Sequence, residues 1–162
     1  MKRALQGFFF LVLSSPAFAA DVVTLRQLSL ELATEIAQTA MQQCRKEGYQ
    51  VSVVVVDRSG AVQAALRDTL APRFTLEISE KKANAVILSG VSSSTFRKNR
   101  ADIRQEMNHI DGIVVLEGGL PITAAGALLG AVGVSGAPGG DKDEACAKVA
   151  LAKVQERLEF AE

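Results

Sequence analysis

The stretch Glu117-Gly-Gly-Leu-Pro-Ile-Thr123 leads into Leu128-Leu-Gly-Ala-Val-Gly-Val-Ser-Gly136 and then into Asp141-Lys-Asp-Glu-Ala-Cys146, and it decides the fold. Its glycines allow turns with positive φ and close approach of neighbouring backbones. The apolar residues between them are typical of paired strands, and an Asp before an apolar-periodic segment is a common helix cap. We therefore expect strands at 120–123 and 127–134, joined across Ala125-Gly126, and a final helix capped by Asp141 or Asp143.

The rest of the chain adds helices and a second hairpin. Thr24 and Gln27 have capping-box spacing, and apolar residues then recur every three or four positions up to Gly48, which predicts a long first helix. The β-branched run 51–56, a turn at 57–60 and the run 61–66 predict an antiparallel hairpin whose first strand is buried on both faces. Further along, the patterns predict a helix from Thr75 to near Gly90, a polar helix at 92–106 and a short buried strand at 113–116. The prediction is an α/β protein of the α+β type, with five antiparallel strands flanked by helices.

The first 19 residues have the pattern of a cleaved secretory signal. Lys2 and Arg3 precede an apolar run, and small residues stand at the −3 and −1 positions of a cut after Ala19. A membrane-spanning helix, the alternative, needs about 20 apolar residues, and this run is half that length. We therefore expect a signal peptide at 1–19 and one mature domain at 20–162, periplasmic or secreted and not held in a membrane after cleavage.

Charge argues against a nucleic-acid partner. After removal of Lys2 and Arg3, Lys plus Arg falls from 18 to 16 against 18 Asp plus Glu, so the net charge is about −2. The basic cluster Arg97-Lys98, Arg100 and Arg104 shares its segment with Asp102 and Glu106, which is typical of a solvated helix face. A phosphate or carboxylate site in this cluster is the alternative.

Cys44 and Cys146 are the only cysteines, and both belong to the mature chain. In an oxidising compartment they could form a disulfide, provided that their Cα atoms come within about 7 Å of each other. The alternative is a pair of small buried thiols, a common state of free cysteine. The sequence leaves both open.

Several motifs together resemble one known family. They are Val54-Val-Val-Asp57 with Gly60, Lys82-Ala83, Gly118-Gly-Leu-Pro-Ile122, Gly130-Ala-Val-Gly-Val-Ser-Gly136 and Asp143-Glu144. On these residues the chain resembles the GlcG/HbpS haem-binding proteins, which are related to the C-terminal domain of PduO. The resemblance implies a profilin-like fold around a five-stranded antiparallel sheet, assembly into homo-oligomers and binding of haem. Relatives often have Arg-Met-Asp-Gly-Ala after the second strand, where this chain has Arg67-Asp-Thr-Leu-Ala71 and so lacks the methionine and the glycine.

A haem site needs an apolar surface, partners for the propionates and an axial donor to iron. His109 is the only histidine and the candidate iron ligand, although a solvated loop histidine is the alternative; Met107 and Tyr49 are weaker donors. Arginine suits carboxylates because its donors are forked. The candidate cofactor-binding residues are His109, Arg67, Asp68, Arg73, Arg97, Gly118, Gly119 and Pro121.

No catalytic constellation stands out in the sequence. Ser135-Gly136 lacks the Gly-x-Ser-x-Gly spacing of a nucleophile turn, and no Gly-x-Gly-x-x-Gly leads from a strand into a helix. We therefore expect an exported haem-binding or haem-sequestering protein, with support of oxidative haem degradation or redox sensing as extensions. Two alternatives stay open: an enzyme or accessory factor acting on a corrinoid, a flavin or a small organic acid, and a ligand-free oligomeric assembly module.

Overall fold

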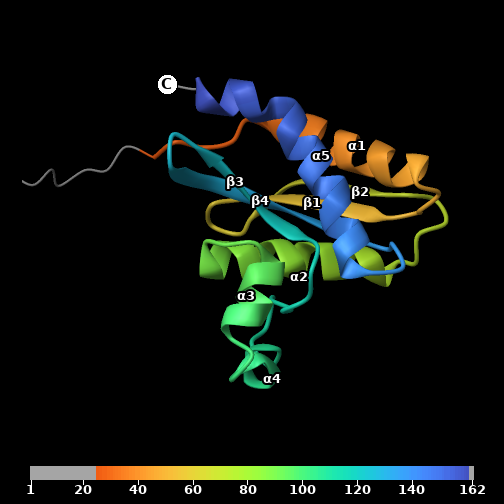
Figure 1. The fold of residues 1–162 in the computed structure, drawn as a ribbon. Coiled ribbons are helices and arrows are strands. Elements are labelled where there is room, and N and C mark those ends of the chain that lie inside the picture. The colour runs from red at the N-terminus through yellow and green to blue at the C-terminus, as the bar shows by residue number, and fades with distance from the viewer. Residues whose placement is uncertain (1–24, 161–162) are drawn as a thin grey trace, which may run out of the picture.

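The protein is built as three layers around one antiparallel sheet (Figure 1). The computed structural model describes residues 25–160. In this part of the chain the sheet has four strands in the order β2-β1-β4-β3. They are β1 (Ser52–Asp57), β2 (Val62–Arg67), β3 (Gly119–Ala124) and β4 (Ala127–Ser135).

Helices cover both faces of the sheet. Helices α1 (Leu30–Lys46) and α5 (Gly140–Glu159) lie on one face, and α2 (Phe74–Ser89) lies on the other. The short helices α3 (Ser93–Asn99) and α4 (Arg104–Met107) continue beyond α2, away from the sheet (Figure 1). Within residues 25–160, no helix is both long and apolar enough to cross a bilayer.

The alternating side chains of β1 explain why this strand is apolar throughout. Val53 and Val55 belong to the core under α1 and α5, whereas Val54 and Val56 pack with Ala83 of α2. Successive side chains of a strand point to opposite faces, so a strand covered on both sides needs apolar residues at every position. The prediction of a doubly covered first strand is confirmed.

The predicted antiparallel α+β architecture is confirmed, but the fifth strand is wrong. Residues 113–116 form no strand, because their backbone groups bond elsewhere than to the sheet. The Val114 N–H donates to the carbonyl of Lys81 in α2 at 3.2 Å, and the Val115 N–H donates to Asn108 Oδ1 at 2.9 Å. Val115 is buried with Ala85 and Phe96. In this run Val115 packs against the helices and Ile113 lies partly buried beside it, whereas Leu116 is exposed.

Two helix boundaries also differ from the prediction. Helix α1 begins at Leu30, where the Ser29 hydroxyl accepts a hydrogen bond from the Leu32 N–H at 3.2 Å; the expected cap Thr24 lies outside the described residues. The predicted polar helix at 92–106 is broken into α3 and α4, since Arg100 leaves the helical conformation with φ −118° and ψ 39°. The predicted stop at Gly90 is confirmed: it is a left-handed C-cap with φ 71°.

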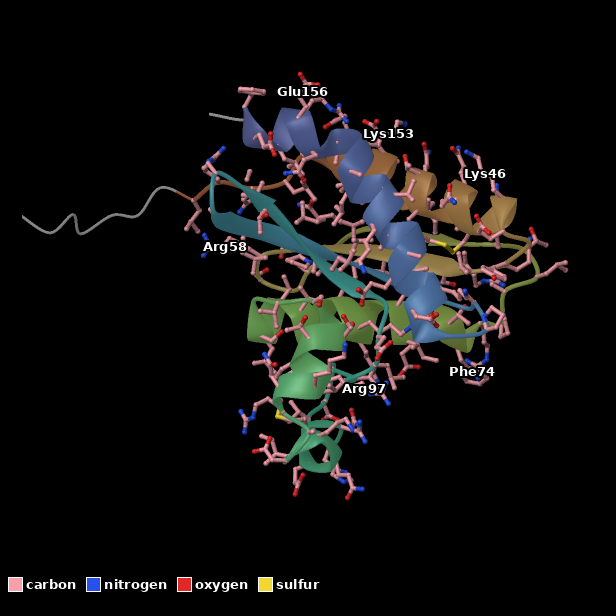
Figure 2. The ribbon with its side chains drawn as sticks, in the orientation of Figure 1. Lys46, Arg58, Phe74, Arg97, Lys153 and Glu156 are labelled. Atoms are coloured by element: carbon pink, nitrogen blue, oxygen red, sulfur yellow. A yellow bond between two sulfur atoms is a disulfide. The ribbon has the colours of Figure 1, made fainter. Side chains whose placement is uncertain are left out.

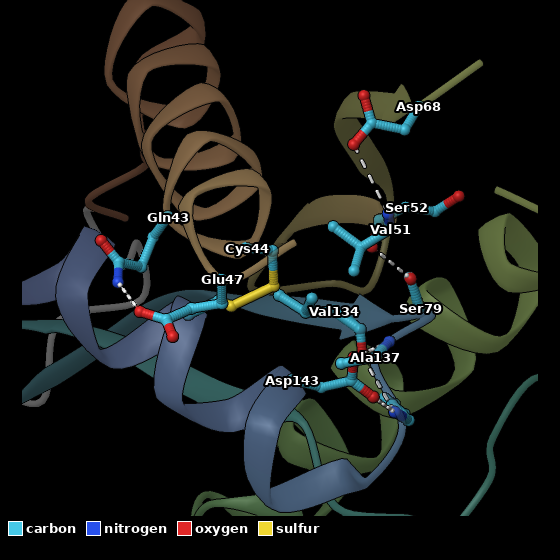
Figure 3. The surroundings of a disulfide bond; sticks show 12 residues. Gln43, Cys44, Glu47, Val51, Ser52, Asp68, Ser79, Val134, Ala137 and Asp143 are labelled. Carbon is cyan, nitrogen blue, oxygen red and sulfur yellow. Dashed lines mark hydrogen bonds and ion pairs between the residues drawn. A yellow bond between two sulfur atoms is a disulfide. The ribbon is translucent and has the colours of Figure 1, made fainter. Parts of the chain in front are cut away.

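A disulfide joins the two helices on the same face of the sheet. Cys44 in α1 and Cys146 in α5 are bonded, with their Cα atoms 5.5 Å apart (Figure 3). This finding decides between the two alternatives that the sequence left open. The bond connects the first and last helices, 102 residues apart in the chain.

Gly133 allows α2 to lie directly on the centre of the sheet. A Cβ atom at this position would overlap the carbonyl oxygen of Ser79 and come within 3.0 Å of the Ala83 nitrogen. We expect Gly133→Ala to lower the free energy of unfolding by about 1–3 kcal/mol, because overpacking forces backbone shifts. Urea unfolding followed by circular dichroism measures it.

The matched control is Gly139→Ala, where a Cβ atom would meet only the carboxylate of the exposed Asp141 side chain, which can move away. Gly139→Ala should lower the free energy of unfolding by less than about 1 kcal/mol. Equal losses in the two variants would contradict the close approach of α2 to the sheet.

Candidate functional site

The α3–α4 segment is held in place by buried contacts with α2 and β3. Ser93, at the first position of α3, accepts a buried hydrogen bond from the Gly119 N–H at 2.9 Å. Phe96, one turn further along, is buried with Ala85 of α2 and with Val115. These two anchors fix α3 against the body of the protein.

An apolar hollow lies between the end of α2, α3 and α4. Its volume is about 440 Å³, and it is lined by Leu88, Ser89, Val91, Phe96, Asn99, Arg100 and Met107. Met107 contributes a thioether, a soft donor for iron, and Arg100 contributes a cation whose Nε lies 3.3 Å from Asp102 Oδ1. Chemically, the hollow offers a largely apolar surface with one soft donor and one forked cation.

His109 is not one of the residues that line this apolar hollow. It occupies an exposed turn just after α4, two residues beyond Met107. Its backbone N–H donates a hydrogen bond to the Glu106 carbonyl at 3.0 Å. Within residues 25–160, no group of three or more His, Cys, Asp or Glu side chains could hold a metal ion. A porphyrin itself supplies four nitrogen ligands to its iron, so one or two donors of the protein complete the coordination.

The candidates Arg67, Asp68 and Arg73 lie together at the other end of α2. Arg67 Nη1 donates to the carbonyls of Asp68 at 3.2 Å and Ala71 at 2.5 Å. The buried Asp68 accepts from Arg45 Nε at 2.7 Å. The Arg73 guanidinium lies 4.1 Å from the centre of the exposed Phe74 ring, at the start of α2 (Figure 2). These contacts shape the β2–α2 loop, about 24 Å from the apolar hollow by the rise of a 16-residue helix.

The remaining candidates surround the start of β3. Arg97 Nη1 lies 3.1 Å from Glu117 Oε1. Gly118 and Gly119 are buried, and a Cβ atom would come within 2.8 Å of Lys82 Nζ at Gly118 and within 2.6 Å of the Lys82 carbonyl at Gly119. Pro121 lies within β3 opposite Ala131. The structure therefore brings Arg97 near the two glycines but separates this group from the β2–α2 loop.

Sequence reasoning missed a buried ion pair behind these glycines. Lys82 Nζ lies 2.8 Å from Asp143 Oδ2 and donates to the Val134 carbonyl at 2.9 Å. Asp143 Oδ1 accepts from the Ala137 N–H at 3.0 Å (Figure 3). Burial raises the pKa of Asp143, although the attraction of Lys82 opposes the rise.

The signals for this pair were present in the sequence. Lys82 falls on the buried face of α2, beside Ala83 and Val86, and Asp143 is in the first turn of α5. Asp143 was expected only as a helix cap. Its carboxylate instead ties the start of α5 to α2 and to the end of β4, while Gly139 is the N-cap residue.

Comparisons with known proteins agree with this fold. A family model described as "Haem degrading protein HbpS-like" matches residues 28–152. The chain is 32% identical to the protein GlcG of Escherichia coli K12 over 109 residues, which cover 67% of this chain and 81% of GlcG.

Solved structures match as well. The crystal structure of HbpS has a TM-score of 0.78 and 35% identity, over 86% of this chain and 99% of that chain. A crystal structure of a PduOC–haem complex has a TM-score of 0.70 and 24% identity, over 78% of this chain and 94% of that chain, so it shows a shared fold.

Proposed function

Since the chain belongs to the HbpS-like family, whose model is described as that of a haem degrading protein, we propose that it binds haem in the apolar hollow between α2, α3 and α4. The single observation that carries this proposal is the lining of the hollow. Leu88 and Phe96 offer apolar surface for a porphyrin face, and Arg100 offers a forked cation for a propionate. When bound, haem would supply a redox-active iron.

His109 would hold the haem iron, and Met107 would assist it. Imidazole is the commoner haem ligand, and the His109 ring, on the exposed turn after α4, makes no hydrogen bond or ion pair with any other described residue. Met107 lines the hollow and is the second donor. Arg67, Asp68 and Arg73 take no part in this site, because they lie at the opposite end of α2.

Titration of the mature protein with haemin tests the proposal. We expect a saturable Soret shift at micromolar haemin. His109→Ala should weaken binding by at least about tenfold, because loss of one coordinate bond removes more than about 1.4 kcal/mol. Met107→Leu keeps the apolar volume and should change the spectrum less. Absorbance titration and magnetic circular dichroism of the bound iron give both readouts.

The matched control is Arg73→Ala, an exposed substitution at the other end of α2 that should leave the titration unchanged. If Arg73→Ala removes the shift while His109→Ala and Met107→Leu retain it, the ligand binds at the β2–α2 loop and the placement is wrong. No saturable shift would contradict haem binding itself. Mass spectrometry of a co-purified ligand would then separate the alternatives, a corrinoid, a flavin or a small organic acid.

We also propose that the protein is exported and that it forms homo-oligomers. The signal-like pattern of residues 1–19, which lie outside the described residues, supports export, and so does the Cys44–Cys146 disulfide, since disulfides persist in oxidising compartments. Homo-oligomer formation, oxidative haem degradation and redox sensing rest on the family alone. Light scattering of the mature protein, and the decay of the Soret band under peroxide, test the first two.

A further inference from the structure

A second hollow, here called the cationic hollow, lies beside α3 and shares no lining residue with the apolar hollow. Its volume is about 420 Å³, and its lining residues are Arg97, Lys98, Ala101, Arg104 and Glu117. Figure 2 shows Arg97 on α3, near the segment that leads into β3. Three cations and one carboxylate give the lining a net charge of two positive units.

Two of the three cations of this hollow have no acidic partner among the described residues. Lys98 and Arg104 make no ion pair or side-chain hydrogen bond with any residue of the described range 25–160. The nearby acid Asp102 pairs with Arg100, which lines the apolar hollow. Charges of alternating sign on a solvated helix face usually pair with one another, whereas Lys98 and Arg104 both line this hollow and have no such partner within residues 25–160.

Arg97 is held in position. The Glu117 carboxylate accepts a hydrogen bond from one of the five N–H donors of Arg97, which leaves the other donors available to a ligand. Glu117 packs closely against Gly140, the first residue of α5, since a Cβ atom on Gly140 would come within 2.7 Å of the Glu117 Cβ atom. The buried Ser93–Gly119 hydrogen bond fixes the start of α3 one turn before Arg97. An arginine held in this way loses less side-chain entropy when an anion binds.

We propose that the cationic hollow binds a small anion that carries at least two negative charges on carboxylate or phosphate oxygens. Arg97 presents a fork that matches either group, Arg104 adds a second fork, and Lys98 adds a compact point charge to the same lining. Glu117 offsets one charge, so a monoanion gains less than a dianion or trianion. Among the described residues that line it, Ala101 is the only apolar one, which distinguishes this hollow from the proposed haem site.

Isothermal titration at low ionic strength tests the proposal with citrate and inorganic pyrophosphate as probes and acetate as the monoanion. We expect saturable 1:1 binding of at least one of the two probes, and weaker binding of acetate. The stronger probe identifies the oxygen chemistry as carboxylate or phosphate. Replacing both Lys98 and Arg104 by alanine should weaken binding by at least about tenfold, because charge-assisted hydrogen bonds are lost.

The matched control replaces two other exposed cations, Lys46 in α1 and Lys142 in α5, by alanine, with the same change in net charge. It should change the affinity less than about twofold. An equal loss in both double variants, or no saturable binding of either probe, would overturn the proposal. Chemical shifts of the Ala101 amide locate the bound anion independently of affinity. The haemin titration of the Lys98/Arg104 variant should be unchanged, so failure here is distinguishable from failure of the haem site.

Discussion

Lys82→Met is expected to lower the free energy of unfolding by about 3–5 kcal/mol, because it leaves the Asp143 carboxylate buried without its partner. Both side chains are 4% exposed, and Lys82 Nζ lies 2.8 Å from Asp143 Oδ2. Methionine keeps the length of the side chain and its helix propensity, so the loss reports the charge. Urea unfolding at neutral pH measures it.

Two further variants serve as a control and as a rescue for Lys82→Met. Lys81→Met, at the neighbouring half-buried position whose Nζ pairs with Glu77, should lower the free energy of unfolding by less than about 0.5 kcal/mol. Adding Asp143→Asn to Lys82→Met should recover most of the loss, since the amide oxygen can still accept from the Ala137 N–H without a buried charge. A Lys82→Met variant as stable as Lys81→Met would contradict a structural role for the pair.

The pH dependence of this loss has a definite sign. Burial raises the pKa of Asp143, so the folded protein holds the proton more tightly than the unfolded chain does. The contribution of Asp143 to stability is therefore greatest below its unfolded pKa of about 4 and falls as pH rises toward the raised folded pKa. Lys82→Met removes the attraction that opposes this rise, so its stability should fall over a wider pH range than that of the unmodified protein.

Removal of the disulfide is the second large effect. Replacing Cys44 and Cys146 together by alanine is expected to lower the free energy of unfolding by about 4–5 kcal/mol, because the bond closes a loop of about 100 residues in the unfolded chain. Guanidinium unfolding of the oxidised protein and of the double variant measures the difference.

Reductant provides the control for this substitution. Dithiothreitol should bring the unmodified protein to nearly the stability of the double variant and leave the double variant unchanged. Both cysteines are buried, so reduction should be carried out under partly denaturing conditions before refolding. A double variant that unfolds at the same midpoint as the oxidised protein would show that the bond adds nothing to stability.

The sequence was most informative where local chemistry alone sets the structure. The turns at 57–60 and 125–126 and the apolar runs beside them predicted both hairpins, and Gly90 predicted the end of α2. Asp57 illustrates why: its Oδ1 accepts from the N–H groups of Ser59 and Ala61, so the turn is specified within five residues.

Prediction failed where distant segments decide the outcome. In the run 113–116, Val115 is buried against α2 and α3, and the apolar pattern of the run is the same as that of a buried strand. Whether Cys44 meets Cys146 depends on how α1 and α5 pack, which no local pattern reports. The sequence pointed to the basic cluster that holds Arg97, Lys98 and Arg104, but not to Glu117, which joins them from the segment before β3. It pointed to Met107 singly, because the other residues that line the apolar hollow come from more than one element.

The short helices α3 and α4 contribute few buried residues to the core. Helix α4 buries none of its residues, and α3 buries only Ser93 and Phe96, whereas β1 is buried along nearly its whole length. Segments with so few buried contacts open locally at a lower free energy than the core. Both hollows exist only while α3 is packed against α2. The apparent affinity for either ligand is therefore reduced in proportion to the fraction of molecules in which α3 is packed in this way.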